Sequence, residues 1–261
     1  AELAGCNAWI DHLARLQLSW YGENQPETPA MEFTRASTAY HPETGEEIPE
    51  DTPVFMPFAG DKQGLLMEEG TENLMTETQS SWEMDISSLV IYGNAQAEQS
   101  SNWAWHGNYS AKVWDADSSS NRVHVRVPVI SDKWSIFSCY VHNPNTSPIT
   151  VYAMNMVTGN VVVLPGETKR LLASRLSRWS GRFDIRIYAN TKDPFFIDGL
   201  MFYRGDKNYH LSWHIGGGTR ANSLMRITLP EALPATFGIG IAAKMLHAHD
   251  TATRTFWQCG G

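Results

Sequence analysis

Six side chains could form a binding surface, because each falls on the polar side of a predicted strand: His124, Arg126, Tyr152, Asp184, Arg186 and Tyr188. In the stretch 122–130, valine at every second position alternates with polar residues, which is the period of a strand with one buried face. The stretch 183–188 repeats this pattern. Because the polar sides of strands in one sheet share a face, we expect the six residues to lie together.

Two kinds of chemistry suit such a face. Aromatic rings pack against the C–H groups of a sugar while Arg, His and Asp exchange hydrogen bonds with its hydroxyls, so the face could be a glycan platform. Tyr and Arg also anchor protein interfaces, so the face could instead be covered by a neighbouring subunit or by the Pro-rich segment near the N-terminus. Both interpretations stay open, and we favour the subunit contact because arginine outnumbers acids there.

The sequence lacks the patterns of common catalytic sites. No G-x-S-x-G motif is present, and Gly216–Gly218 are not followed by the Lys-Ser/Thr of a phosphate-binding loop. Most acids fall in the Pro-rich segment or in turns, without a pair placed for glycoside hydrolysis. The histidines of the stretch 247–250 could bind a transition metal, but they need a further ligand that the sequence does not supply. We therefore expect that the protein is not an enzyme.

The predicted strands are organised around the stretch 183–203, FDIRIYANTKDPFFIDGLMFY. Its first half alternates apolar and polar residues, whereas PFFIDGLMFY is apolar on both faces apart from Asp198 and Gly199, as in a strand covered on both sides. The turn residues NTKDP between the halves predict a β-hairpin. Asp198 is then a buried carboxyl group, which is costly unless it has a partner.

Further strand-length runs are separated by clusters of Gly, Pro, Asn, Asp and Ser. They occupy residues 89–92, 106–116, 122–130, 134–142, 149–157 and 161–165. Together with the hairpin they make about eight strands, the number in a jelly roll, so we predict an all-β jelly-roll β-sandwich. Cys139 lies within one of these runs and is expected to be a small core residue.

Composition excludes some classes of partner. The chain has 261 residues, a net charge of −8 and no basic run that could neutralise phosphates, so we expect no nucleic-acid partner. No apolar stretch approaches the roughly 20 residues that cross a membrane as a helix. Cys6, Cys139 and Cys259 are far apart and odd in number, which argues against a disulfide framework.

The two ends of the chain differ from its middle. Residues 3–18 place apolar side chains at three- and four-residue spacing, which predicts an amphipathic helix that packs on its own domain or serves as an oligomerisation arm. Residues 22–64 are rich in Pro, Glu and Thr and are expected to be extended. The stretches 237–246 and 253–259 look like two strands, too few to close a sandwich. We expect them to continue into a longer protein or to pair with another subunit.

Several motifs connect the sequence to a family. FTRASTAY at 33–40, followed by GLLMEEGTENLM at 64–75, resembles a pattern of bacteriophage virion proteins, F-[ST]-R-A-[ST] and then G-L-L-[IV]-E-E and T-N-L. Met67, Gly70 and Glu72 depart from that pattern. HGNYSAKV and PFFIDGLMF resemble segments of jelly-roll sugar-binding modules, and TRANSL resembles the entry into a laminin-G-like or concanavalin-like sandwich.

The resemblance implies a structural protein of a phage particle, in a tail, fibre or capsid-decorating position, with a jelly roll as its interaction module. Other virion proteins are the implied partners. The apolar stripe in residues 3–16 and the unfinished C-terminal strands would expose apolar surface, so we also expect a homo-oligomer, with a trimer favoured in a fibre. A cell-surface glycan is the partner under the glycan-platform interpretation. A glycan-binding adhesion module and a non-catalytic part of an envelope-degrading hydrolase are the alternatives.

The resemblance also implies a structural calcium ion at Asp198, with Glu72 and Asn73 as the candidates for its other ligands. The alternative for Asp198 is a carboxyl group that is satisfied by hydrogen bonds alone.

These features divide the chain into four predicted parts. They are a helical arm (1–21), an extended Pro-rich segment (22–75), the jelly-roll module (76–205), and a linker with the first strands of an incomplete second sandwich (206–261).

Overall fold

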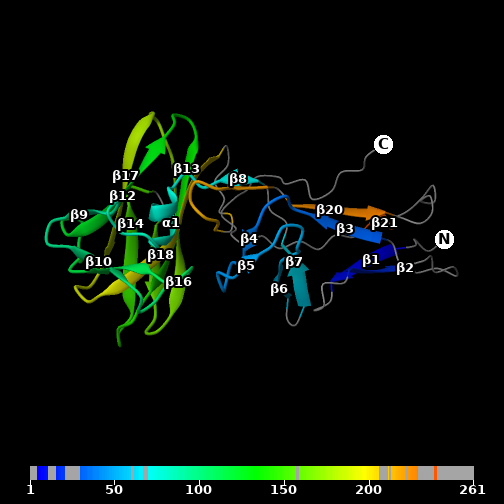
Figure 1. Cartoon of the computed structure of the whole chain (residues 1–261), viewed down its shortest axis with the longest axis horizontal. Coiled ribbons are helices and arrows are strands. Elements are labelled where there is room, and N and C mark those ends of the chain that lie inside the picture. Colours follow the sequence, from blue (N-terminus) through cyan, green and yellow to red (C-terminus); the bar gives the residue numbers. More distant parts are fainter. Residues whose placement is uncertain are drawn as a thin grey trace. The chain divides into compact units, whose positions relative to one another are not determined.

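A computed structural model of the chain confirms the all-β class (Figure 1). The backbone is described for residues 5–10, 16–20, 30–59, 62–66, 70–156, 159–205, 211, 213–221, 223–228 and 238–239. Strands dominate these ranges, in which the helix α1 (Glu77–Ser81) is five residues long. No helix within this part of the chain is long and apolar enough to cross a membrane.

The chain folds into two compact units. The first consists of Ala1–Thr38, Ile48–Gly70 and Ala221–Gly261, and the second of Ala39–Glu47 and Thr71–Arg220. The second unit holds the sandwich, and it includes residues 39–47 and 206–220, which lie outside the predicted module of residues 76–205.

The sandwich consists of two antiparallel five-stranded sheets, in agreement with the predicted jelly roll. The front sheet has the order β15-β14-β17-β12-β9, and the back sheet has the order β10-β11-β18-β13-β16. The front strands are β9 (Val90–Tyr92), β12 (Arg122–Val129), β14 (Ile149–Met154), β15 (Asn160–Val163) and β17 (Gly181–Ala189). The back strands are β10 (Gln96–Ser100), β11 (Ser110–Trp114), β13 (Trp134–His142), β16 (Thr168–Leu176) and β18 (Phe195–Gly205).

The core between the sheets follows from the period of two. The four valines of β12 are at most 4% exposed, and Ile185 and Ile187 of β17 join the same cluster. From the back sheet, β13 contributes Phe137, Cys139 and Val141. Cys139 is fully buried and unpaired, which confirms its predicted place in the core.

The predicted β-hairpin over 183–203 is wrong. β17 pairs with β12 and β14 in the front sheet, whereas β18 pairs with β11 and β13 in the back sheet. The turn residues 190–194 therefore carry the chain from one sheet to the other. Because hairpins and such crossings use the same turn residues, the local sequence does not distinguish them.

Strand β18 is apolar on both faces because both faces are covered. Phe195 and Ile197 face the core, while Met201 and Tyr203 belong to a second cluster on the outer side of the back sheet. Residues outside the sandwich strands complete this cover, notably Tyr40, Leu211 and Trp213. The outer face of the back sheet is thus occupied by the chain itself.

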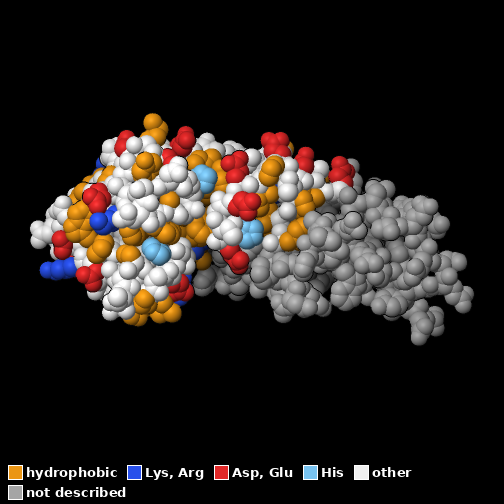
Figure 2. Space-filling view, turned by 60° about the horizontal axis from the view of Figure 1, so that its bottom comes forward, with side chains coloured by type: hydrophobic (Ala, Val, Ile, Leu, Met, Phe, Trp, Pro, Cys, Tyr) orange, Lys and Arg blue, Asp and Glu red, His pale blue; other side chains and the backbone are white. Residues whose placement is uncertain are grey.

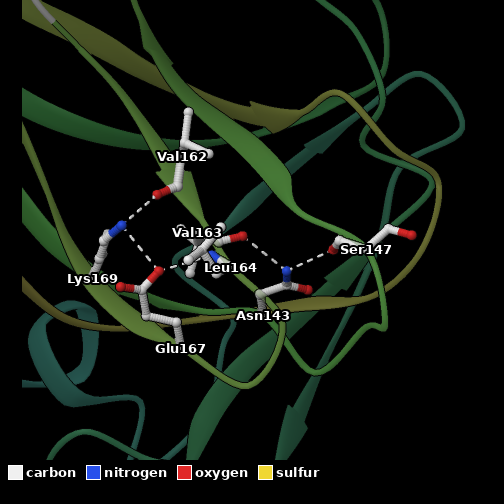
Figure 3. Close-up of polar contacts among 7 residues, drawn as sticks. All are labelled: Asn143, Ser147, Val162, Val163, Leu164, Glu167 and Lys169. Atoms are coloured by element: carbon white, nitrogen blue, oxygen red, sulfur yellow. Dashed lines mark hydrogen bonds and ion pairs between the residues drawn. The ribbon is translucent and has the colours of Figure 1, made fainter.

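Hydrogen bonds and an ion pair of side chains stabilise one edge of the sandwich (Figure 3). Asn143, directly after β13, donates through Nδ2 to the carbonyl oxygens of Ser147 and Val163, both at 2.9 Å. Glu167 lies in the turn before β16, and its carboxylate is 3.0 Å from the ammonium group of Lys169 in that strand. The bond from Asn143 to Val163 connects the edge strand β15 of the front sheet to the segment that follows β13 of the back sheet.

The predicted N-terminal helix is wrong. β1 (Gly5–Ile10) and β2 (Leu16–Trp20) form an antiparallel pair in which Ala8 lies opposite Leu18 and Ile10 opposite Leu16. Residues 16–20, LQLSW, alternate with the period of a strand, and this signal competes with the three- and four-residue spacing of the wider stretch.

The C-terminal strands of the first unit pair with its N-terminal strands. β20 (Leu224–Thr228) pairs with β3 (Ala30–Thr34), and β21 (Gly238–Ile239) pairs in parallel with β1. The described strands of the C-terminal region thus have partners in the same unit, and the second sandwich stays a prediction. The other strands outside the sandwich are β4 (Ala39–Tyr40), β5 (Glu47–Ile48), β6 (Phe55–Ala59), β7 (Lys62–Leu65), β8 (Thr71–Glu72) and β19 (Thr219–Arg220). Residues 247–250 and the strand predicted at 253–259 lie outside the described residues.

The FTRAST motif forms a hydrogen-bonded turn in the first unit. Arg35 is 3% exposed and donates to the carbonyl oxygens of Ser37 and Pro49 at 2.9 and 2.8 Å. Its backbone N–H donates to Asp51 at 2.8 Å. The Ser37 hydroxyl accepts the N–H of Ala221 at 2.9 Å, so the FTRAST and TRANSL motifs lie side by side.

Candidate functional site

The structure brings all six predicted side chains together on the outer face of the front sheet. The alternation that directs the valines of β12 into the core leaves His124 and Arg126 on the opposite side, and β17 presents Asp184, Arg186 and Tyr188 in the same way. The register places His124 beside Arg186 and Arg126 beside Asp184, while Tyr152 of β14 lies beside Tyr188. Their function stays a prediction.

Three of these side chains form a charged cluster. Arg126 Nε donates to Asp184 Oδ1 at 2.9 Å, and this bond holds the pKa of the Asp184 carboxyl below its usual value. His124 Nδ1 lies 3.7 Å from the second carboxylate oxygen. Burial lowers the pKa of His124, with a further contribution from the positive charges of Arg122 and Arg186. The imidazole is therefore a neutral group at neutral pH.

Aromatic rings lie on both sides of this cluster. Tyr152 and Tyr188 stack with ring centroids 4.9 Å apart and an interplanar angle of 14°. Tyr92 of the edge strand β9 is 52% exposed, and the Arg122 guanidinium lies 4.2 Å from its ring centroid. Such a face offers ring surface and polar groups side by side.

Sequence reasoning missed Tyr92 and Arg122 as members of the face. Tyr92 is the last residue of the predicted strand 89–92, and Arg122 is the first residue of the predicted strand 122–130. The alternation of β12 places Arg122 on the same side as His124. The register of β9 against β12, which pairs Tyr92 with Arg122, is a long-range feature that the local sequence does not encode.

Several polar atoms of this face are buried without a hydrogen-bond partner. They are Arg122 Nε, Arg186 Nε and both ring nitrogens of His124. Arg122 is 7% exposed and His124 is 6% exposed, and buried polar groups are nearly always satisfied by protein, water or ligand. The atoms thus have the capacity to bind groups of a molecule placed on the face.

Asp198 lies elsewhere, on the covered side of the back sheet. It is fully buried, and its Oδ2 accepts the backbone N–H groups of Trp105 and His106 at 2.8 and 3.0 Å. Burial raises the pKa of Asp198 to about 8, although these bonds oppose the shift. Its Oδ1 has no hydrogen-bond partner. The buried carboxyl group predicted from the sequence is thus only partly satisfied by hydrogen bonds.

The other two predicted calcium ligands have different surroundings. Asn73 is fully buried, and its carboxamide donates to two carbonyl oxygens and accepts the N–H groups of Met75 and Phe202 at 3.2 and 3.0 Å. This leaves the amide no capacity for a cation, and Glu72 is exposed in β8. Among the described residues, no group of three or more His, Cys, Asp or Glu side chains could hold a metal ion.

Glu83 is the acid that the sequence prediction overlooked. Its Oε1 accepts the backbone N–H groups of Asn108 and Tyr109 at 2.9 and 2.8 Å, and its charge contributes to the raised pKa of Asp198. Asp198 and Glu83 together thus hold the backbone of the segment 105–109.

A separate hollow of about 480 Å³ opens at one end of the sandwich. It is lined by Trp134, Asn155, Met156, Arg175, Leu176 and Arg178. Arg175 donates to the carbonyl oxygen of Asn155 at 3.0 Å, so one of its two arginines is already engaged.

No protein-family model and no curated protein sequence matches the chain. Solved structures with some similarity include the CBM22-1 and GH10 modules of Clostridium thermocellum xylanase 10B with xylohexaose, at 14% identity and a TM-score of 0.40 over 48% of this chain and 28% of that one. A family 61 carbohydrate-binding module with β-1,4-galactotriose matches at 17% identity and a TM-score of 0.38, over 52% of this chain and all of the module.

A third similar structure is the enzymatically active domain of tailspike protein 4 of bacteriophage CBA120. It matches at 7% identity and a TM-score of 0.34, over 51% of this chain and 22% of that one. Similarities of this size carry no functional conclusion, and the sandwich is defined by its own strand pairing.

Proposed function

We propose that the second unit is a carbohydrate-binding module whose ligand lies on the outer face of the front sheet. The observation that carries the proposal is the set of buried polar atoms without partners, Arg122 Nε, Arg186 Nε and the His124 nitrogens, next to the stacked rings of Tyr152 and Tyr188. Sugar hydroxyls both donate and accept hydrogen bonds, so they suit guanidinium donors and a neutral imidazole.

The aromatic side chains supply the apolar part of such a site. Tyr92 is 52% exposed, while Tyr152 and Tyr188 are half-buried, so each keeps ring surface available for the C–H groups of a sugar. The outer face of the back sheet offers no comparable place, because Tyr40, Leu211 and Trp213 cover it.

A glycan array with three proteins tests this function. We expect the wild type to bind a defined set of glycans, Tyr188→Ala to lose the signal, and Tyr109→Ala to retain it. Tyr109 is a matched control because it is 40% exposed and precedes β11 of the back sheet. Failure of the wild type to bind any glycan, or equal loss in both variants, would contradict the proposal.

The motif resemblance supports a second candidate, a docking module within a phage particle. The edge strand β9 favours it, because Val90, Ile91 and Tyr92 are 38%, 45% and 52% exposed and such an edge suits protein contact. Under this proposal the chain forms a homo-oligomer, with a trimer favoured, and meets other virion proteins. Sedimentation of the wild type and of Ile91→Glu tests it: a monomer in both cases argues against self-assembly, and loss of an oligomer in the variant supports it.

A further inference from the structure

The charges of the front sheet are unbalanced. Among the residues of its five strands, the basic side chains are Arg122, Arg126, Arg182 and Arg186, and Asp184 is the one acid. The whole chain has a net charge of −8, and Figure 2 shows acidic side chains scattered over the described part of the surface in this view. The front sheet therefore differs in sign from the protein as a whole.

The single acid does not neutralise the arginines nearest the rings. Asp184 is engaged by Arg126 at 2.9 Å, and His124 lies 3.7 Å from its other oxygen. Arg122 and Arg186 have no carboxylate partner among the described residues, and Nε of each is buried without a hydrogen bond. Two guanidinium groups thus retain an uncompensated positive charge.

These two arginines lie close to one point of the face. Arg186 pairs directly with His124 across β17 and β12, while Arg122 lies two residues from His124 on the same side of β12. Two residues along a strand span about 7 Å. Burial is the main cause of the lowered pKa of His124, and both guanidinium charges act on the ring in the same direction. A carboxylate or phosphate group placed over His124 could therefore reach both arginines.

We infer that the ligand of this face is an acidic saccharide, whose carboxylate or phosphate group binds between Arg122 and Arg186 while its sugar ring packs on Tyr152 and Tyr188. The inference rests on the proposed function and names the class of carbohydrate. The hydroxyls of a neutral sugar could accept hydrogen bonds from the two guanidinium groups but would leave their positive charge unbalanced, whereas an anion supplies acceptors and the opposite charge together.

Isothermal titration with matched probes tests the inference. The probes are α-1,4-tetragalacturonate, its methyl ester in which every carboxylate is neutralised, glucose 6-phosphate, and poly-L-glutamate as an anion without sugar. We expect tetragalacturonate or glucose 6-phosphate to bind at least tenfold more tightly than the ester, and the advantage to decrease as salt is added. Binding by one of the two and not by the other identifies carboxylate or phosphate as the group.

Two arginine variants locate the effect. Arg186→Gln should weaken binding of the acidic sugar roughly tenfold, because a charge-assisted hydrogen bond is lost, while binding of the ester changes little. Arg182→Gln also removes one positive charge from β17, four residues before Arg186. It should change the affinity for the acidic sugar less than twofold. A thermal melt of each variant establishes that the sandwich is intact.

The possible failures have separate meanings. Equal affinity for tetragalacturonate and its ester, with loss in Tyr188→Ala, would overturn the acidic ligand and leave the carbohydrate-binding function standing. Poly-L-glutamate binding as tightly as the acidic sugars would also overturn it, because charge alone would then explain the affinity. If no sugar binds and Arg186→Gln instead dissociates an oligomer, the face is a contact between copies, and the proposed function fails as well.

Discussion

At the scale of single residues, the front sheet carries an unusual set of buried polar atoms. Arg122 and His124 are 7% and 6% exposed, yet Arg122 Nε and both ring nitrogens of His124 lack hydrogen-bond partners. Leaving such groups unsatisfied costs about 1–3 kcal/mol each, so a water molecule or a ligand that bonds to them stabilises the protein. Ligand binding is the role that agrees with the neighbouring rings.

The buried imidazole predicts a dependence of stability on pH. The pKa of His124 is lowered from 6.5 by burial, with Arg122 and Arg186 acting in the same direction and Asp184 opposing them. Below about pH 6.5 the unfolded chain binds a proton that the native ring resists, so acidification lowers the free energy of unfolding. We expect His124→Gln to lose part of this decrease between pH 6.5 and pH 5, measured by denaturation at each pH. Parallel curves for the two proteins would show that His124 titrates normally.

Asp198 predicts a response to calcium. Burial raises the pKa of its carboxyl to about 8, so a cation bound to its partnerless Oδ1 would stabilise the charged form in the native state only. We expect calcium added to a chelator-treated sample to raise the melting temperature, and Asp198→Asn to abolish the response. Asp193→Asn, in the exposed turn before β18, is the control. An unchanged melt in the wild type would mean that hydrogen bonds alone satisfy a protonated Asp198.

At the scale of elements, the fate of β17 and β18 shows what a local pattern predicts. The alternation of β17 and the two-sided apolarity of β18 correctly indicated one polar face and two covered faces. Their pairing was wrong, because the choice between a hairpin and a crossing depends on strands far away in the sequence, β12 and β13.

Two strands of the sandwich were missed for different reasons. β10, QAEQS, has almost no apolar residues because it is an edge strand paired on one side. β16, TKRLLASRL, breaks the alternation with the adjacent residues Leu171 and Leu172. Neither carries the period of two that made the valine-rich β12 recognisable.

Gly199 in β18 predicts a large cost of substitution. Its φ is +57°, and an added Cβ would lie 2.8 Å from atoms of both Trp105 and Tyr140. We expect Gly199→Ala to lower the free energy of unfolding by roughly 2–4 kcal/mol, combining backbone strain and overpacking. Gly217→Ala is the matched control, since its φ is +71° with no atom within 4 Å, and it should cost only about 1 kcal/mol. Equal costs in chemical denaturation would contradict the steric argument.

At the scale of the whole molecule, the candidate face was more predictable than the arrangement of the chain around it. Alternation alone placed His124, Arg126, Asp184, Arg186 and Tyr188 on polar sides of their strands, and the sheet order then joined them. Sequence could not show that Tyr40 and Trp213, far apart in the chain, cover the back sheet. It also could not show that β3 and β1 pair with strands from the C-terminal end.

The charge distribution also emerges only in three dimensions. A net charge of −8 argues against anionic partners when it is considered alone, yet four arginines and one acid occupy the strands of the front sheet. A local excess of one sign directs the approach of ligands at short range, because surface charges are screened beyond about 8–10 Å at physiological salt.

The most direct test of the account is where a saccharide binds. In two-dimensional NMR, the Nε–Hε resonances of Arg122 and Arg186 report on two buried groups that lack partners in the free protein. On titration with an acidic oligosaccharide, we expect these two resonances to shift together and in proportion to saturation, while that of Arg175 at the separate hollow stays in place. Shifts confined to Arg175 and the Trp134 indole, with Arg122 and Arg186 unchanged, would contradict a binding face on the front sheet.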